Sequence, residues 1–488
     1  MKKIFTTIIT FIILLATLCI NVFAFDAPSK GTVLRVSGLT KNGESVLIQD
    51  YSSFEDGWNA AMELAINSKE MNSKKFVRVI VDIYDNWNAV DGEFTSDFIN
   101  GKGFNWDAIY FQPNVRMTVN LNGFTINRGL KEYQYNGEVI YIDKRADVII
   151  NNGTITGGFS CNGAGGIHIN DGANVTLNSV NVIGNAVEDD NGTGIAVYDN
   201  AILTMYGGSV SNNLSYSTSP AVYGGGVYIE DSSAFFENVV FENNQGLKYS
   251  THGAAVYVNN GILEMDDCQI IGNGINSKID GINYVGAYTI IDISNNSNVY
   301  IKDTKFLMNG YAIEAYIKHN TFSYTSVIKS TASYLTMESC TFTNNKQVYL
   351  IESNASILTV SDTDFTNNDS FAFYGNCADI SDSTFTNCLF SYNEPMLQLT
   401  HTFYFNISKA NLTFIDCDFG FATFNNKKSV TFIDSKNGNF NHTGAMLSDG
   451  SFIVVVTLLS LMTSILAIAI TIFSNKKKIT STEVEAGE

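Results

Sequence analysis

The chain has 488 residues, of which 45% are hydrophobic and 12% aromatic. It carries 29 Lys and Arg against 48 Asp and Glu, so its net charge is −19 at pH 7. This acidic balance argues against nucleic acid or anionic lipid as the main partner. It fits a soluble surface outside a cell, or a surface that binds cations.

Residues 1–24 have the pattern of a secretory signal peptide. Lys2 and Lys3 precede an uncharged apolar run, and Val22-Phe23-Ala24 has the form of a cleavage signal. We therefore expect the mature chain to begin at Phe25. An uncleaved membrane anchor is the alternative.

The segment 25–115 differs from the rest of the chain. The stretches 32–36 and 76–84 predict strands, and residues 52–67 predict an amphipathic helix whose apolar face carries Phe54, Trp58, Ala61 and Ala65. Because the open end of a solenoid exposes unpaired strand edges, we interpret this segment as a small α/β N-terminal cap. A separate binding domain is the alternative.

Residues 116–437 repeat one short pattern. In eleven copies an apolar strand residue is followed five residues later by a second apolar residue, often Phe, with Asp or Asn at the corner between them. Asn follows three residues later at 185, 213, 244, 273, 309, 345 and 368. Alternation of period two predicts strands, and the Asp and Asn corners predict turns.

A constant gap of five residues is what a parallel β-helix requires. Its coils stack about 4.8 Å apart, so equivalent residues lie above one another, and a slip of one residue would turn a core side chain outward. The repeat predicts about 11–12 coils. It also predicts a structural ladder of stacked side chains that comprises Phe241, Phe306, Phe342, Phe365, Phe385, Phe419, Asn244, Asn309, Asn345 and Asn368.

The cysteines follow the same repeat. Cys268, Cys340 and Cys417 stand two residues before the Phe position, where other copies have Thr304, Thr363 or Ser383. This parity predicts small packing thiols inside the solenoid rather than disulfides or metal ligands. Cys388 falls on the Asn ladder, and Cys377 has no place in the pattern.

The C-terminal part predicts a membrane anchor. After a linker, 438–451, residues 452–473 form an uncharged apolar run that is long enough as a helix to cross a bilayer. Lys476, Lys477 and Lys478 follow at once, which predicts a cytoplasmic tail over 474–488 and an ectodomain outside the cell. We expect a monomer held in the cell membrane by this single C-terminal span.

Gly165-Gly166-Ile167, Gly225-Gly226-Val227, Phe306-Leu-Met-Asn309 and Phe342-Thr-Asn-Asn345 resemble the repeats of chlamydial polymorphic outer-membrane proteins. Residues from 54 onwards also resemble the start of pectate-lyase-like β-helix surface proteins of anaerobic Gram-positive bacteria. The resemblance spans roughly residues 50–435. It implies an all-β fold with a right-handed parallel β-helix and, for the chlamydial group, surface adhesion. In place of the C-terminal barrel of that group, the C-terminal part of this sequence predicts a single helix.

The sequence carries no complete catalytic set. Pectin hydrolases of this fold have paired aspartates, Gly-His-Gly and Arg-x-Lys, whereas here Asp189-Asp190 lies in a turn and His252-Gly253 lacks the first glycine. His168 alternates with two isoleucines and should point outward. No cofactor is predicted. Glu188, Asp189 and Asp190 could bind Ca²⁺, although a solvated acidic loop is the simpler interpretation.

The long segments between repeats are the candidate binding surface. They hold Tyr284, Tyr288, Tyr311, Tyr316, Phe322 and Tyr324, and exposed aromatic side chains suit recognition of sugars or proteins. We therefore expect a surface-anchored adhesin or binding protein without catalytic machinery, whose partner is an extracellular glycan or a protein of a host or neighbouring cell. A membrane-tethered polysaccharide lyase or glycoside hydrolase, and a purely structural spacer, are the alternatives.

Overall fold

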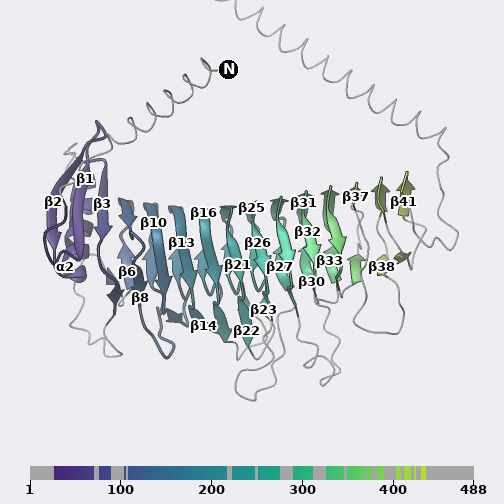
Figure 1. Cartoon of the computed structure of the whole chain (residues 1–488), viewed down its shortest axis with the longest axis horizontal. Coiled ribbons are helices and arrows are strands. Elements are labelled where there is room, and N and C mark those ends of the chain that lie inside the picture. Colours follow the sequence, from purple (N-terminus) through teal and green to yellow (C-terminus); the bar gives the residue numbers. More distant parts are fainter. Residues whose placement is uncertain are drawn as a thin grey trace, which may run out of the picture.

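The protein forms a parallel β-helix, as the repeat predicts. The structure, a computed structural model, describes residues 27–70, 76–89, 104–105, 108–216, 222–247, 251–274, 289–310, 326–345, 349–368, 371–375, 382–388, 403–407, 411–418, 422–424 and 430–435. Within them the chain is all-β apart from one helix, and most strand pairs are parallel. Figure 1 shows the strands stacked coil upon coil along the long axis, in chain order.

Three strands and the helix form the start of the described chain. β1 (Leu34–Leu39) pairs antiparallel with both β2 (Ser45–Tyr51) and β3 (Arg78–Ile83). Helix α2 (Phe54–Glu70) buries the four residues of its predicted apolar face. β3 also pairs in parallel with β7 (Arg116–Asn120), so parallel stacking begins inside the segment interpreted as a cap.

Two parallel sheets run along the solenoid. Sheet A continues from β3 and β7 through β4 (Trp87–Asn88), β8 (Thr125–Asn127), β10 (Asp147–Thr156), β13 (Asn174–Ile183), β16 (Ile202–Ser211), β20 (Ser233–Glu237), β21 (Val240–Glu242), β25 (Ile262–Asp266), β26 (Gln269–Ile271), β28 (Asn298–Lys302), β29 (Lys305–Leu307), β31 (Tyr334–Glu338), β32 (Thr341–Thr343), β34 (Ile357–Ser361), β35 (Asp364–Thr366), β37 (Asp382–Thr386), β39 (Asn411–Ile415) and β41 (Val430–Ile433).

Sheet B comprises β5 (Phe104–Asn105), β6 (Ala108–Phe111), β9 (Ile140–Ile142), β12 (Ile167–Ile169), β15 (Ile195–Val197), β19 (Val227–Glu230), β24 (Val256–Asn259), β27 (Thr289–Ser294), β30 (Ser326–Thr331), β33 (Tyr349–Asn354), β36 (Phe371–Gly375), β38 (Phe403–Ile407) and β40 (Ala422–Phe424). Two short sheets lie beside the middle coils. Sheet C holds β11 (Phe159–Ser160), β14 (Ala186–Glu188), β17 (Leu214–Tyr216) and β22 (Gln245–Leu247), and sheet D holds β18 (Val222–Tyr223) and β23 (Thr251–His252).

Apolar side chains from both sheets fill the interior. In sheet A, Phe306 pairs with Phe342 and Phe342 with Phe365, and their rings stack at centroid distances of 4.2 and 4.8 Å. Phe241 pairs with Ile270, which pairs in turn with Phe306. All of these side chains are buried. The register therefore places the Phe position of each coil above that of the next.

A buried asparagine ladder runs beside the Phe stack. Asn185, Asn213, Asn244, Asn273, Asn309, Asn345 and Asn368 are all at most 1% exposed. The side-chain oxygen of each from Asn213 onward accepts the backbone N–H of the preceding ladder residue, at 3.0 to 3.2 Å. This ladder satisfies the backbone groups that each corner would otherwise bury without a partner.

A second corner of each coil carries what we call the small-residue ladder: Cys268, Thr304, Cys340, Thr363, Cys388, Cys417 and Ser435. Cys268 N–H donates to Thr304 Oγ1 at 3.3 Å, and Cys340 N–H donates to Thr363 Oγ1 at the same distance. The cysteines of this ladder are buried and free, as predicted for Cys268, Cys340 and Cys417.

Two predictions near the C-terminal end are wrong. Phe385 pairs with Val360 and with Phe414, not with Phe365, so it lies in the strand before the Phe position. Cys388 accordingly belongs to the small-residue ladder rather than to the Asn ladder. The reason is that both corners share one pattern, in which a left-handed residue, such as Asn367 (φ 54°) or Asn387 (φ 51°), directly precedes an inward one. Phe419 lies outside the described residues.

The predicted signal peptide, linker, membrane span and tail also lie outside the described residues and stay predictions. Among the residues that the structure describes, no helix is both long and apolar enough to cross a membrane.

Candidate functional site

The outer face of sheet B carries one continuous row of side chains. Tyr141, His168, Ala196, Tyr228, Tyr257, Asp292, Lys329 and Glu352 occupy the same register position in consecutive strands from β9 to β33. Each alternates with inward residues, as Asp292 does between Ile291 and Ile293, which are fully buried. The row is therefore aromatic over its first coils, except at Ala196, and charged over its last three.

The aromatic part of the row is a set of stacked rings. Tyr141 and His168 lie 4.7 Å apart between ring centroids, and Tyr228 and Tyr257 lie 5.4 Å apart with planes only 2° from parallel. Burial lowers the pKa of His168 to about 4, so this imidazole is neutral near pH 7. Burial likewise raises the pKa of Tyr257 to about 12.

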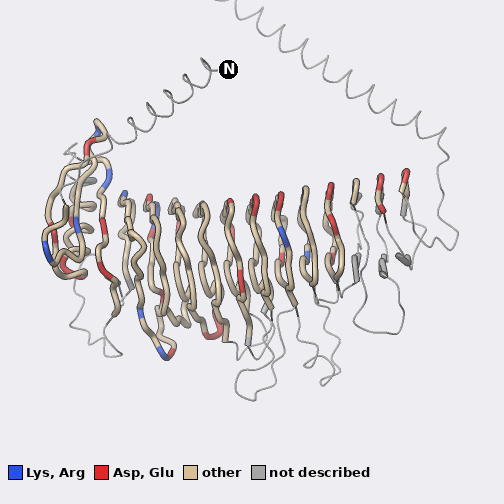
Figure 2. The backbone as a smooth tube through the Cα atoms, in the orientation of Figure 1, with Lys and Arg blue, Asp and Glu red and all other residues tan. Residues whose placement is uncertain are grey.

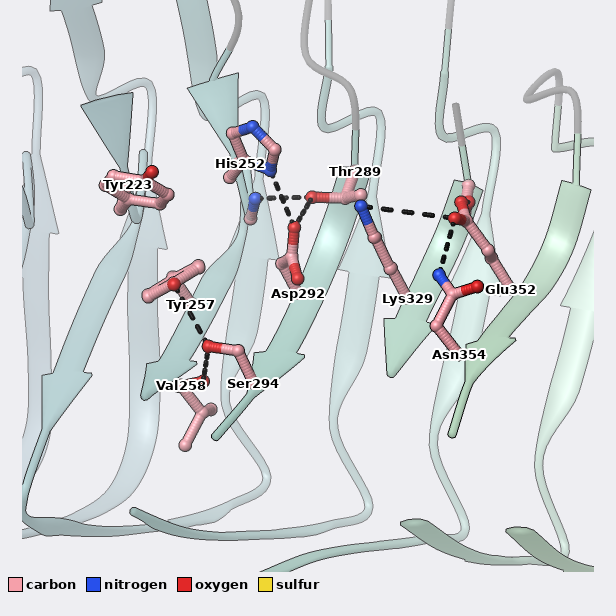
Figure 3. A network of polar contacts seen from close by, with 12 residues as sticks. Tyr223, His252, Tyr257, Val258, Thr289, Asp292, Ser294, Lys329, Glu352 and Asn354 are labelled. Atoms are coloured by element: carbon pink, nitrogen blue, oxygen red, sulfur yellow. Dashed lines mark hydrogen bonds and ion pairs between the residues drawn. The ribbon is translucent and has the colours of Figure 1, made fainter. Parts of the chain in front are cut away.

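Sheet D adds two more rings at the junction of the aromatic and charged parts. Tyr223 of β18 lies 4.6 Å from the ring of Tyr257 and 5.3 Å from the ring of His252 on β23. The Tyr257 hydroxyl is 3.0 Å from Ser294 Oγ, which donates to the carbonyl of Val258 at 3.2 Å. These contacts fix the Tyr257 ring beside the charged residues (Figure 3).

Asp292 is the centre of the first polar cluster. Its Oδ2 lies 2.8 Å from His252 Nδ1 and accepts a hydrogen bond from Thr289 Oγ1 at 3.1 Å. Thr289 Oγ1 accepts in turn from the N–H of Gly253 at 2.7 Å. Asp292 is 4% exposed, whereas the His252 side chain is 25% exposed. A buried carboxylate thus orients a histidine that solvent can reach.

Glu352 is the centre of the second cluster. Ser326 Oγ donates to Glu352 Oε2 at 2.6 Å, and Asn354 Nδ2 donates to Oε1 at 3.0 Å. Lys329 Nζ lies 4.0 Å from Oε1. Lys329 also pairs with Asp292 in the sheet register, so it stands between the two buried carboxylates (Figure 3).

The polar groups that reach solvent are therefore limited in number and fixed in place. The Lys329 side chain is 26% exposed, comparable with that of His252. Asp292, Lys329 and Glu352 together carry one net negative formal charge. Figure 2 shows acidic positions along most coils and few basic ones beyond the N-terminal part. This face can offer hydrogen bonds and ring surfaces, but little attraction to an anion.

The aromatic residues predicted to bind a ligand lie outside the described residues. Tyr284 and Tyr288 fall in 275–288, and Tyr311, Tyr316, Phe322 and Tyr324 fall in 311–325. Along the chain, however, these two segments lead directly into Thr289 and Ser326. Thr289 and Ser326 are the first residues of β27 and β30. Each of them belongs to the site and directly follows a predicted binding segment.

Glu188, Asp189 and Asp190 do not converge on one point. Asp190 accepts the backbone N–H of Gly163 at 2.6 Å and that of Asn191 at 2.7 Å, and Asp189 has a left-handed backbone with φ 55°. Asp190 therefore acts as a turn former. In the described part of the chain no group of three or more His, Cys, Asp or Glu is placed to hold a metal ion.

The repeat pattern did not single out Tyr257, Asp292, Lys329 or Glu352, and His252 stood only in an incomplete catalytic motif. A sequence signal for them does exist. In the strands that follow a glycine pair, and in the equivalent strands of later coils, one outward residue stands between two inward ones, as in Ile291-Asp292-Ile293. Aligning these strands gives the row directly. The contact between His252 and Asp292 has no such signal, because the two residues belong to different sheets and stand 40 positions apart.

Comparison with known proteins supports the fold. A family model described as a right-handed β-helix region matches residues 107–298. No curated protein and no solved structure matches the chain. A β-helix domain suggests a surface protein, a binding protein or a carbohydrate-related protein, and this match does not show the resemblance to chlamydial repeats.

Proposed function

We propose that this chain is a cell-surface binding protein whose ligand is a neutral or amino-sugar glycan, and whose binding surface is the outer face of sheet B around Tyr257, Asp292, Lys329 and Glu352. The observation that carries the proposal is the row itself. It brings a ring face and two hydrogen-bonded carboxylates together over adjacent coils, and His252 of sheet D contacts the first of these carboxylates.

The combination suits a polyhydroxylated ligand. A Tyr ring offers an apolar face with a polar tip, and a small number of placed polar groups fixes the orientation of a bound molecule. Because coils repeat about every 4.8 Å, the same face offers equivalent positions along a line. A polymer of repeating units can therefore contact several coils at once.

The negative charge of the protein limits which class of glycan this face can bind. The three charged residues of the row sum to one negative charge, and the whole chain has a net charge of −19. A polyuronic acid would meet repulsion over its whole length, whereas a neutral or cationic sugar would not. Display of this face outside the cell rests on the predicted signal peptide and C-terminal span, which remain part of the proposal.

Glycoside hydrolysis is the second candidate, and one observation favours it. Asp292 and Glu352 are both buried carboxylates and stand two coils apart, or about 10 Å between strands at about 4.8 Å per coil. This strand spacing is slightly larger than the separation of about 6.5–9.5 Å that inverting glycosidases keep between their two carboxyl groups. Hydrolysis by these two carboxylates would give no role to Lys329, which stands between them.

A glycan array tests the proposal. The purified full-length chain, in detergent, is applied to neutral, amino-sugar and uronic-acid glycans. We expect binding to neutral or amino sugars and none to uronic acids. Binding confined to uronic acids would overturn the ligand class, and an absence of binding would favour a structural spacer.

Incubation with each bound glycan separates binding from catalysis. New reducing ends that disappear in both Asp292→Asn and Glu352→Gln would establish the hydrolase. A glycan recovered intact supports the binding protein.

A further inference from the structure

The last described coils contain two neighbouring thiols. β37 pairs with β39, so Phe385 lies opposite Phe414, and the cysteines three residues after each occupy the same corner of adjacent coils. The N–H of Asp418 donates to the Cys388 carbonyl at 2.9 Å, which continues this register through the corner. Among the described cysteines, no other two are neighbours in the small-residue ladder.

The other cysteines of the ladder are flanked by hydroxyl residues. Cys340 lies between Thr304 and Thr363, and Cys268 is followed by Thr304. Burial raises the pKa of both of these thiols to about 12. They are therefore protonated and weakly nucleophilic at neutral pH.

Cys388 and Cys417 differ because their thiols contact each other. A hydrogen bond from Cys388 lowers the pKa of Cys417, and the same contact together with burial raises the pKa of Cys388. Stacked coils lie about 4.8 Å apart, which is inside the range of about 4.4–6.8 Å between the Cα atoms of disulfides. The backbone already holds the two residues at a distance that a disulfide accepts.

We propose that Cys388 and Cys417 form a disulfide that links two successive coils at the C-terminal end of the described solenoid. The proposal is independent of the glycan site. It also departs from the sequence analysis, in which Cys417 is only a packing thiol and Cys388 belongs to the other ladder.

The reaction is a thiol–disulfide exchange with a small-molecule or protein disulfide. The Cys417 thiolate attacks one donor sulfur and releases one donor thiolate, giving a mixed disulfide. The Cys388 thiolate then attacks the Cys417 sulfur and releases the second. The protein loses two protons and two electrons, and the donor is reduced to two thiols.

The link would act near the C-terminal end of the described solenoid. Each coil contacts only its neighbours, and in the described chain only the coil of β40 and β41 stacks beyond the two linked coils. A disulfide between residues 388 and 417 closes the chain between them and lowers the entropy of the unfolded state. We therefore expect the oxidised protein to unfold at a higher temperature than the reduced protein.

Refolding in a redox buffer tests the proposal without requiring access to buried thiols. The full-length chain is unfolded and reduced, then refolded with reduced and oxidised glutathione. It is denatured again, labelled with a maleimide and weighed by mass spectrometry. We expect the wild type to have two fewer reactive thiols than a sample refolded under reduction, with one peptide linking Cys388 to Cys417.

Two variants make the result specific. Cys417→Ser should lose the link, and the matched Cys340→Ser, at an equivalent buried corner flanked by threonines, should retain it. A refolded wild type in which both thiols remain reactive would overturn the proposal. So would a link from Cys388 or Cys417 to another cysteine.

Discussion

Asn309 is held in the middle of the asparagine ladder by five hydrogen bonds. Its side-chain amide donates to the Ile270 carbonyl at 2.7 Å and to Asn345 Oδ1 at 3.0 Å, and its N–H donates to Asn345 Oδ1 at 3.1 Å. Its own Oδ1 accepts from the N–H and the side chain of Asn273, at 3.0 and 3.3 Å. Asn309 thus ties three successive coils together.

Replacing Asn309 by Ala should therefore cost far more than the loss of one contact. The N–H of Asn273 and the carbonyl of Ile270 would be left buried, and each unpaired group costs about 1–3 kcal/mol. We expect the free energy of unfolding to fall by about 2–5 kcal/mol in urea titration.

Asn178→Ala is the matched control, because this half-buried residue belongs to an outer ladder and donates to Asn151 at 2.7 Å. It should cost no more than about 1 kcal/mol. Equal losses in the two variants would contradict the role given to the buried ladder.

Glu138 gives the protein a pH dependence of known sign. It is 2% exposed, its Oε2 has no hydrogen-bond partner, and burial raises its pKa to about 7. Above the ordinary pKa of a glutamate, the unfolded chain releases this proton while the folded chain keeps it. Stability from this group therefore falls between about pH 4.5 and pH 7, by roughly 3 kcal/mol, and changes little above that.

Comparing Glu138→Gln with the wild type isolates this contribution. We expect Glu138→Gln to become more stable relative to the wild type, in unfolding free energy, as the pH rises from 5 to 8. Glu237→Gln, on the exposed outer face of β20, should follow the wild type. A difference between Glu138→Gln and the wild type that is the same at both pH values would refute the assignment.

At the scale of strands, the repeat predicted correctly which residues stack in neighbouring coils, provided that the Asn corner and the small-residue corner of a coil could be told apart. Phe306, Phe342 and Phe365 align because backbone hydrogen bonds fix the spacing along sheet A. Phe385-Thr-Asn imitates Phe365-Thr-Asn, but in the structure it lies opposite Val360. The sequence alone could not separate the two corners, because both place a left-handed residue, often Asn or Asp, directly before an inward one.

Cross-linking tests this register directly. In a background with the native cysteines changed to Ser, Val360→Cys with Phe385→Cys should form a disulfide on oxidation, because paired Cα atoms are about 4.8 Å apart. Phe365→Cys with Phe385→Cys should not. Linkage in the second pair and not the first would restore the alignment predicted from the five-residue gap.

At the scale of the whole molecule, the fold and the site differ in how far the sequence predicts them. Stacking repeats itself in every coil, so eleven copies of one pattern specify it. The site arises where the row changes from Tyr257 to Asp292, Lys329 and Glu352, and a single change leaves no periodic signal. His252 joins it only because sheet D folds against sheet B.

The acidic surface and the row together define what the molecule can recognise. Few basic positions follow the N-terminal part (Figure 2). The carboxylates of Asp292 and Glu352 are already hydrogen-bonded to neighbouring side chains. Such an arrangement holds its side chains in place before a ligand arrives, which lowers the entropy lost on binding. The prediction is a rigid face for a neutral or amino-sugar polymer.

Calorimetric titration of the full-length chain with a glycan selected on the array tests this central claim most directly. Asp292→Asn keeps the shape of the side chain but weakens its hold on His252 and Thr289. We predict a dissociation constant raised about tenfold or more, equivalent to about 1.4 kcal/mol. The matched Asn178→Ala variant, on the outer face of sheet A, should bind as the wild type does. An unchanged dissociation constant in Asp292→Asn, or an equal loss in both variants, would contradict the account.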